Sequence, residues 1–115
     1  MELGSIVGQE LTAVEFVLDH LQLRFDGPLL TLYAWPEVFR EEGSYAFGEP
    51  EYRNVLCGLI AVEVTAATLE EGEGLEIGFA NGGTIRLSLR EEDVDGPQAG
   101  GFSESGSVHD VDFEF

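Results

Sequence analysis

LEIGFANGGTIRLSL, residues 75–89, is the stretch whose hydrophobic pattern and turn residues agree on one structure, a β-hairpin. Apolar residues alternate with polar or small ones on both sides of the Asn-Gly-Gly at residues 81–83, as in two half-buried strands around a turn. A three-residue loop keeps the apolar side chains on one face, whereas a two-residue loop would oppose them to polar ones. The predicted pairs are Phe79–Ile85, Ile77–Leu87 and Leu75–Leu89.

The N-terminal half repeats this pattern. Residues 10–18 and 21–25 alternate, and a third strand runs through Leu30, Leu32 and Ala34. A two-residue loop predicts the pairs Leu18–Leu21, Phe16–Leu23 and Val14–Phe25.

The two halves align with each other. IVGQELTAVEF, residues 6–16, lies over LIAVEVTAATL, residues 59–69, and LQLRF, residues 21–25, lies over LEIGF, residues 75–79. A repeated pattern of this kind indicates one structural unit written twice. Each unit is predicted to be a short apolar helical turn followed by a three-stranded antiparallel meander.

The predicted fold is mainly β, of the α+β class, with the two tandem units packed as a pseudo-symmetric six- or seven-stranded sheet or open barrel. We expect one domain over residues 1–115, divided as follows. The parts are a first unit at about 5–38, an ordered linker at 36–50, a second unit at about 51–95 and a Gly/Ser-rich tail at 96–115. Within them we expect a helix at 51–59, mobility at 96–107 and an edge strand at 108–115.

Charge limits the possible partners. The chain has 23 Asp and Glu against 5 arginines and no lysine, for a formal net charge of −18. Such a surface repels nucleic-acid phosphates and anionic membranes, so neither is an expected partner. The start MELGSIVGQEL is acidic where a signal peptide is basic, and no apolar run approaches the ~20 residues of a membrane helix. One cysteine leaves no internal disulfide, and we expect a soluble cytoplasmic protein.

Few residues suggest chemistry, and we expect no catalytic residue, cofactor or metal. His20 and His109 each follow or precede an aspartate, but neither has another nitrogen or sulfur ligand at a recognisable spacing. Cys57, in the predicted helix, is expected to be a small buried or half-buried packing residue rather than a nucleophile. The acidic segment at residues 93–96 fails as a calcium loop, because Pro97 would occupy position five and Gln98 position six.

One apolar surface stands out in the first unit. The outer face of its third strand carries Leu29, Tyr33 and Trp35, whereas the matching face of the second unit is polar. These three residues form the candidate contact surface, since Trp and Tyr are enriched in interfaces. The alternative is that the linker, the helix or the C-terminal strand covers them.

YRNVLCGLI, residues 52–60, followed by a meander and by LREEDVDGPQAGGF, residues 89–102, resembles a group of small bacterial proteins without an assigned activity. Their pattern is a YRxxLCxLIG helix, a meander and an SLxxED segment leading into GPEAxxF. Ala61 stands where that pattern has glycine, and Gln98 where it has glutamate. The resemblance implies a bacterial origin and a compact domain, and it transfers no residue role.

The expected function is that of a non-catalytic intracellular protein-interaction domain, whose partner is another protein or a second copy of the chain. The alternative is an immunity-type inhibitor that binds a basic toxin through its acidic surface. A hydrolase built on carboxylates ranks third.

Overall fold

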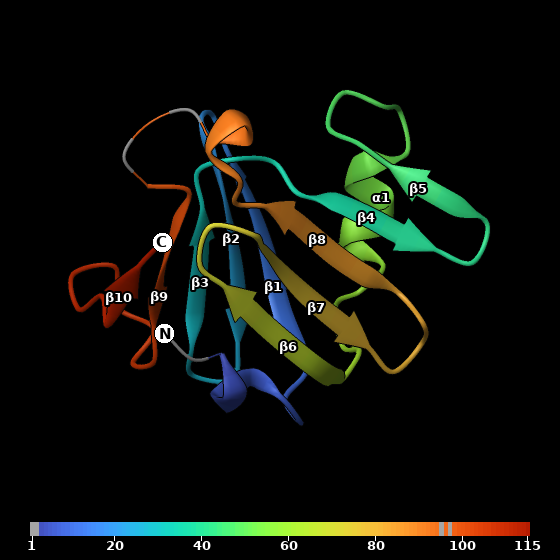
Figure 1. The fold of residues 1–115 in the computed structure, drawn as a ribbon. Helices are drawn as coiled ribbons and strands as arrows, with labels where there is room; N and C mark the ends of the chain where they lie inside the picture. The colour runs from blue at the N-terminus through green and yellow to red at the C-terminus, as the bar shows by residue number, and fades with distance from the viewer. Residues whose placement is uncertain (1–2, 95, 97) are drawn as a thin grey trace.

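The computed structural model describes residues 3–94, 96 and 98–115, and within them the chain forms two five-stranded antiparallel sheets (Figure 1). Sheet 1 consists, in spatial order, of β1 (Leu11–Val17), β2 (His20–Phe25), β3 (Leu29–Leu32), β9 (Gly100–Ser103) and β10 (Phe113–Glu114). Sheet 2 consists of β5 (Gly43–Tyr45), β4 (Glu37–Arg40), β8 (Thr84–Ser88), β7 (Gly74–Phe79) and β6 (Val64–Glu70).

Helical segments are short. The 3-10 turn η1 (Gly4–Ile6) precedes β1, the helix α1 (Tyr52–Cys57) precedes β6, and the 3-10 turn η2 (Glu91–Asp93) follows β8. The helix predicted at 51–59 is therefore present but shorter, and it packs against β1 and β4. Over the described residues, no helix has the length and apolar character needed to cross a membrane.

The prediction of a mainly β fold with two three-stranded meanders is confirmed, in β1–β2–β3 and β6–β7–β8. The prediction of a single six- or seven-stranded sheet or open barrel is wrong. Each meander instead gains two strands from the other half of the chain: β9 and β10 join β3, while β4 and β5 join β8 (Figure 1). The described residues form no closed barrel. Along the chain, β1–β5 and β6–β10 are thus two series of five strands, and the last two strands of each series belong to the other sheet.

Both hairpin registers differ from the prediction by two residues. Phe16 pairs with Leu21 rather than Leu23, and Ile77 pairs with Ile85 rather than Leu87. A shift of two leaves every side chain on its predicted face, because side chains alternate with a period of two. The predicted core faces are therefore correct although the pairings are not.

Turn geometry explains the second shift. The Phe79 N–H donates to the Gly83 carbonyl at 2.9 Å, so the loop is Ala80, Asn81 and Gly82 rather than residues 81–83. Gly82 has φ of +89°, the left-handed conformation that glycine adopts without a steric penalty. In the first hairpin Val17 pairs with His20, which leaves residues 18 and 19 as the turn.

The two halves meet through reciprocal backbone hydrogen bonds. Gly8 N–H donates to the Val64 carbonyl at 2.8 Å, and Ala61 N–H donates to the Leu11 carbonyl at 2.7 Å. The sequence alignment equates Gly8 with Ala61 and Leu11 with Val64. Each half thus donates an equivalent backbone hydrogen bond to the other half.

Further features repeat around this joint. Glu10 and Glu63, which are equivalent in the alignment, face each other in an isolated antiparallel bridge. The register slips by one residue after Leu11 in β1 and after Val64 in β6. Buried side chains from both sheets form one core. It includes Leu3, Ile6, Leu23, Leu30, Leu56, Leu59, Ile77 and Ile85.

The two segments predicted to lie outside the units are parts of the sheets. The predicted linker at 36–50 contains the hairpin β4–β5, and the tail predicted to be mobile contains β9, whose four residues are all buried. A Cβ at Gly100 would collide with the Thr31 carbonyl oxygen and the Phe115 ring. The glycines here permit close strand packing. The predicted edge strand at 108–115 is confirmed as β10, at reduced length.

Candidate functional site

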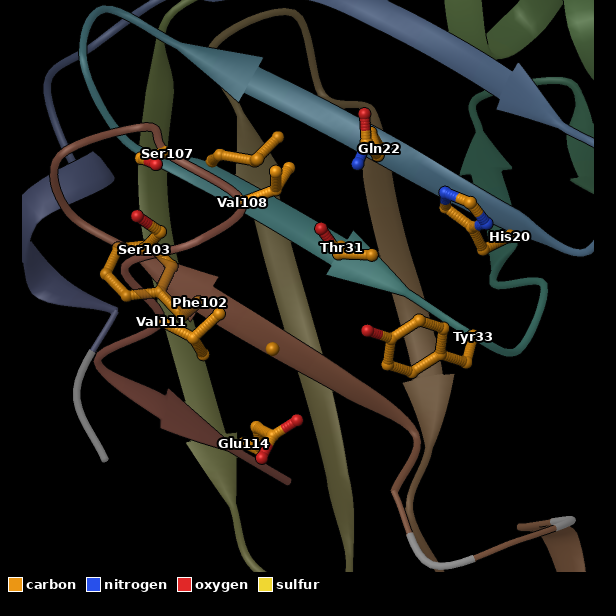
Figure 2. Close-up of a pocket in the computed structure, with 12 residues that line it drawn as sticks. His20, Gln22, Thr31, Tyr33, Phe102, Ser103, Ser107, Val108, Val111 and Glu114 are labelled. Carbon is orange, nitrogen blue, oxygen red and sulfur yellow. The ribbon is translucent and has the colours of Figure 1, made fainter.

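A groove of about 140 Å³ lies on the outer face of sheet 1, between β2 and β3 on one side and the C-terminal segment on the other (Figure 2). Three of its lining side chains are large, apolar and exposed: Tyr33 at 49%, Val108 at 50% and Val111 at 47%. Exposed apolar side chains scattered singly need no explanation, but a group of them around one hollow marks a candidate contact site.

The floor of the groove is a row of residues that crosses four strands. Gln22 pairs with Thr31, Thr31 with Gly101, and Gly101 with Glu114, so these four residues form one row across β2, β3, β9 and β10. Gly101 has no side chain, so the row has a gap between Thr31 and Glu114 that is partly closed. A Cβ at Gly101 would lie 3.4 Å from Val111 Cγ1 and 3.7 Å from Glu114 Cγ. Figure 2 shows Thr31, Tyr33 and Glu114 around this gap.

Glu114 is the one carboxylate among the residues that line the groove. Glu114 is exposed, and its Oε1 accepts a hydrogen bond from Gln98 Nε2 at 3.0 Å. No arginine is among the groove's lining residues, and no ion pair to Glu114 is found in the described part of the chain. A carboxylate has lone pairs for about four hydrogen bonds, so Glu114 can accept more.

The His20 and Tyr33 rings are in contact at one end of the groove. His20 Nδ1 lies 2.8 Å from Asp19 Oδ1, and this hydrogen bond holds the pKa of Asp19 below its usual value. The Tyr33 ring meets the His20 ring edge-on, with 6.1 Å between centroids. Ser103 lies at the other end of the groove, where its hydroxyl is 3.2 Å from that of Ser105 (Figure 2). The histidine and this serine are therefore not placed as a base and its nucleophile.

The structure brings two of the three candidate contact residues together. Leu29 and Tyr33 line the groove, although Leu29 is buried. Trp35 lies in a separate aromatic cluster, stacked on Phe47 at 4.3 Å and on Phe16 at 6.3 Å between centroids. The strand alternation that placed Trp35 beside Tyr33 fails because β3 ends at Leu32 and the chain crosses to sheet 2.

A second, wider cleft of about 530 Å³ runs past Trp35 along β7 and β8. Its polar groups largely bond to one another: Arg90 lies 3.8 Å from Glu73, and Ser88 donates to Asp93 at 2.7 Å. Both arginines of this cleft, Arg86 and Arg90, thus have a glutamate partner, whereas Glu37, which also lines it, has no ion pair among the described residues. Of the rejected calcium loop at 93–96, Asp95 lies outside the described residues, as does Pro97.

The remaining candidates have little supporting geometry. Cys57 is exposed, so the prediction of a buried or half-buried packing residue is wrong. It lies at the end of α1, whose buried side chains are Tyr52 and Leu56. His109 is exposed as well. Among the described residues, no group of three or more His, Cys, Asp or Glu side chains is placed to hold a metal ion.

Sequence reasoning missed the C-terminal wall of the groove, formed by Val108, Val111 and Glu114. The available signal was the alternation at residues 108–115, which predicted an edge strand but not its neighbour. Without a role for the glycine-rich β9, that strand could not be placed beside β3. Comparisons of the chain with protein-family models, with curated proteins and with solved structures find no match.

Proposed function

We propose that the chain is a non-catalytic intracellular protein-interaction domain that binds its partner with the outer face of sheet 1. The observation that carries this proposal is the gathering of Tyr33, Val108 and Val111, all about half exposed, around one groove. An apolar centre with a polar rim is the usual composition of a protein contact.

Size favours a protein partner over a small substrate. The groove has about 140 Å³, whereas pockets for small molecules typically have about 300–1,000 Å³. A space of this size suits one side chain of a larger partner. The separation of His20 from Ser103 supports the same choice, because hydrolysis would need converging groups.

Charge favours a basic partner over a second copy. The net charge is −18, and two of the five arginines are already bound to glutamates at 2.7 Å, in the pairs Arg24–Glu15 and Arg86–Glu76. Two copies of such a chain repel each other, whereas a basic surface is attracted. An immunity-type inhibitor of a basic toxin is one protein of this kind, and the bacterial resemblance suits it.

We also infer that the two halves are tandem copies of one five-strand unit. The equivalent bonds of Gly8 and Ala61 and the exchange of β4–β5 for β9–β10 support this inference. The copies differ at the groove, because Thr31 in sheet 1 corresponds to Arg86 in sheet 2. A difference between copies is where a function added to the repeat is expected.

A photo-cross-linking amino acid at Val108 tests the proposal in cells that produce the protein. The matched control is the same amino acid at Leu18, which is 98% exposed at a hairpin tip and does not line the groove. We expect a discrete cross-linked partner from position 108 that is absent from position 18. Equal cross-linking from both positions would contradict the proposal.

Self-association is distinguished by mass and by salt. A cross-linked homodimer would identify the partner as a second copy, and its association should strengthen at about 0.5 M salt because screening reduces repulsion. Binding to a basic protein should weaken under the same change. Light scattering at low and high salt measures the first case, and titration calorimetry with the identified partner measures the second.

A further inference from the structure

We propose that the gap at Gly101 is a socket for one basic side chain, arginine or lysine, of the partner protein. This inference rests on the proposed protein-binding function and specifies its central contact. The row Gln22–Thr31–Gly101–Glu114 forms the floor of the socket and one wall, and Tyr33 and Val111 lie on its rim.

The socket has contacts for both the aliphatic stem and the charged head of a basic side chain. The aliphatic stem would pack on Val111 and on the Tyr33 ring, whose face also attracts a cation. The charged head would reach the Glu114 carboxylate and the Thr31 hydroxyl. A charge-assisted hydrogen bond to a carboxylate is about twice as strong as a neutral one.

Sheet 2 has a cation at the position in this row that Thr31 occupies in sheet 1. Thr31 corresponds to Arg86, and Gln22 to Glu76, in the alignment of the two halves. Glu76 pairs with Arg86, and Arg86 pairs with Glu37 on the next strand. Arg86 therefore has an acidic residue on each side.

In that row the cation is bound. The Arg86 Nη2 lies 2.7 Å from Glu76 Oε1, and its guanidinium lies 4.6 Å from the centroid of the Phe39 ring. The chain thus fills this position in sheet 2 with its own arginine, which is bound to the Glu76 carboxylate and lies over an aromatic ring. The row in sheet 1 has no cation, and it has Gln22 and Gly101 where sheet 2 has Glu76 and Glu37. Its carboxylate, Glu114, comes from β10 on the other side of the gap, and the Tyr33 ring lies at the rim.

The test titrates the full chain with Nα-acetyl-lysine amide and Nα-acetyl-arginine amide, and follows backbone amide shifts by NMR. The uncharged control is Nα-acetyl-norleucine amide. We expect shifts confined to Thr31, Tyr33, Gly101 and Glu114 and their neighbours, with a Kd on the order of millimolar for ligands of this size. Norleucine amide should produce no comparable shifts.

Two variants locate the binding. Glu114→Gln, at an exposed position, should weaken it about fivefold, as for loss of a surface ion pair. Glu63→Gln removes the same charge outside the groove and should leave it unchanged. Thr31→Arg places an arginine of the chain itself beside Gly101, at the position of Arg86 in sheet 2, so it should occupy the socket and abolish binding while the protein stays folded.

Three results would overturn the socket: shifts spread over the whole acidic surface, equal affinity in Glu114→Gln, or no shifts at about 50 mM ligand, well above the expected Kd. If the socket fails while cross-linking from Val108 succeeds, the protein contact stands and only its central residue is misassigned. If cross-linking from Val108 fails while the socket binds the basic ligands, the socket stands and the proposed protein contact is wrong.

Discussion

Ala61→Gly should stabilise the protein, although it removes a side-chain atom. Ala61 has φ of +72° and is the one non-glycine residue with positive φ among the described residues. Its N–H donates to the Leu11 carbonyl at the joint between the two halves, so the left-handed conformation is held by that bond. The equivalent residue, Gly8, makes the reciprocal bond with φ of +89°.

The magnitude follows from two opposing terms. A left-handed conformation costs an L-residue about 1–2 kcal/mol, which glycine avoids. Glycine also increases the conformational entropy of the unfolded chain, and this offsets the gain by about 0.4–1 kcal/mol. Ala61 is exposed, so little burial is lost. The net gain is about 0.5–1 kcal/mol, which raises the Tm by roughly 2–4 °C for a chain of this length.

Thermal and urea unfolding of both single variants measure the effect. Gly8→Ala is the matched control, because a Cβ there meets no atom within 4 Å and its cost is purely conformational. It should lower the Tm by a similar amount. If Ala61→Gly lowers the Tm, or Gly8→Ala leaves it unchanged, then backbone conformation at the joint does not limit stability and the reasoning is wrong.

Further expectations concern charge, burial and metals. Glu63→Gln should raise the free energy of unfolding by a few tenths of a kcal/mol, because Glu10 faces Glu63 across a bridge; denaturant titration at low and about 0.5 M salt should show the gain shrinking with salt. Tyr52→Phe should lower it by about 1–2 kcal/mol, because the buried Tyr52 hydroxyl donates to the Pro36 carbonyl. Burial also raises the pKa of Tyr52 above its usual value of 10.0, so the native state keeps a proton that the unfolded state releases. Stability from this group is present below pH 10 and lost as the pH rises above it, and a pH series should be flatter for Tyr52→Phe. Calcium or zinc at micromolar concentration should not raise the Tm, since three or more metal-binding side chains do not converge anywhere in the described ranges.

The faces of the strands could be predicted from the sequence, whereas their partners could not. Leu75, Ile77, Ile85 and Leu87 are buried as their alternation requires. A shift of two residues keeps every one of them buried, so alternation alone cannot distinguish the observed pairing from the predicted one. The choice depends on loop conformation, in which Gly82 takes the left-handed position.

The exchange of strands between the two sheets could not be predicted from the local sequence pattern. The glycine-rich composition around Gly100 is typical of mobile segments, and only the proximity of Thr31 and Phe115 shows that a side chain would not fit. Such a contact joins residues about 70 positions apart. The groove could not be predicted for the same reason. Tyr33 and Glu114 lie far apart in the sequence, and β9, which pairs with both β3 and β10, brings them to the same groove.

The shared topology of the two sheets makes their differences informative about function. A position that matters only for the fold should be filled alike in both rows, because both rows stand at the same place in the same arrangement of strands. Arg86 and its glutamate satisfy each other within sheet 2. In sheet 1, a glycine replaces Glu37, a threonine replaces Arg86, and a carboxylate lies beyond the gap. Glu76 and Glu37, the two acidic neighbours of Arg86, correspond to Gln22 and Gly101, so sheet 1 loses them together with the cation and has instead the Glu114 carboxylate on β10. No ion pair to Glu114 is found among the described residues, and we propose that this carboxylate serves what the groove binds.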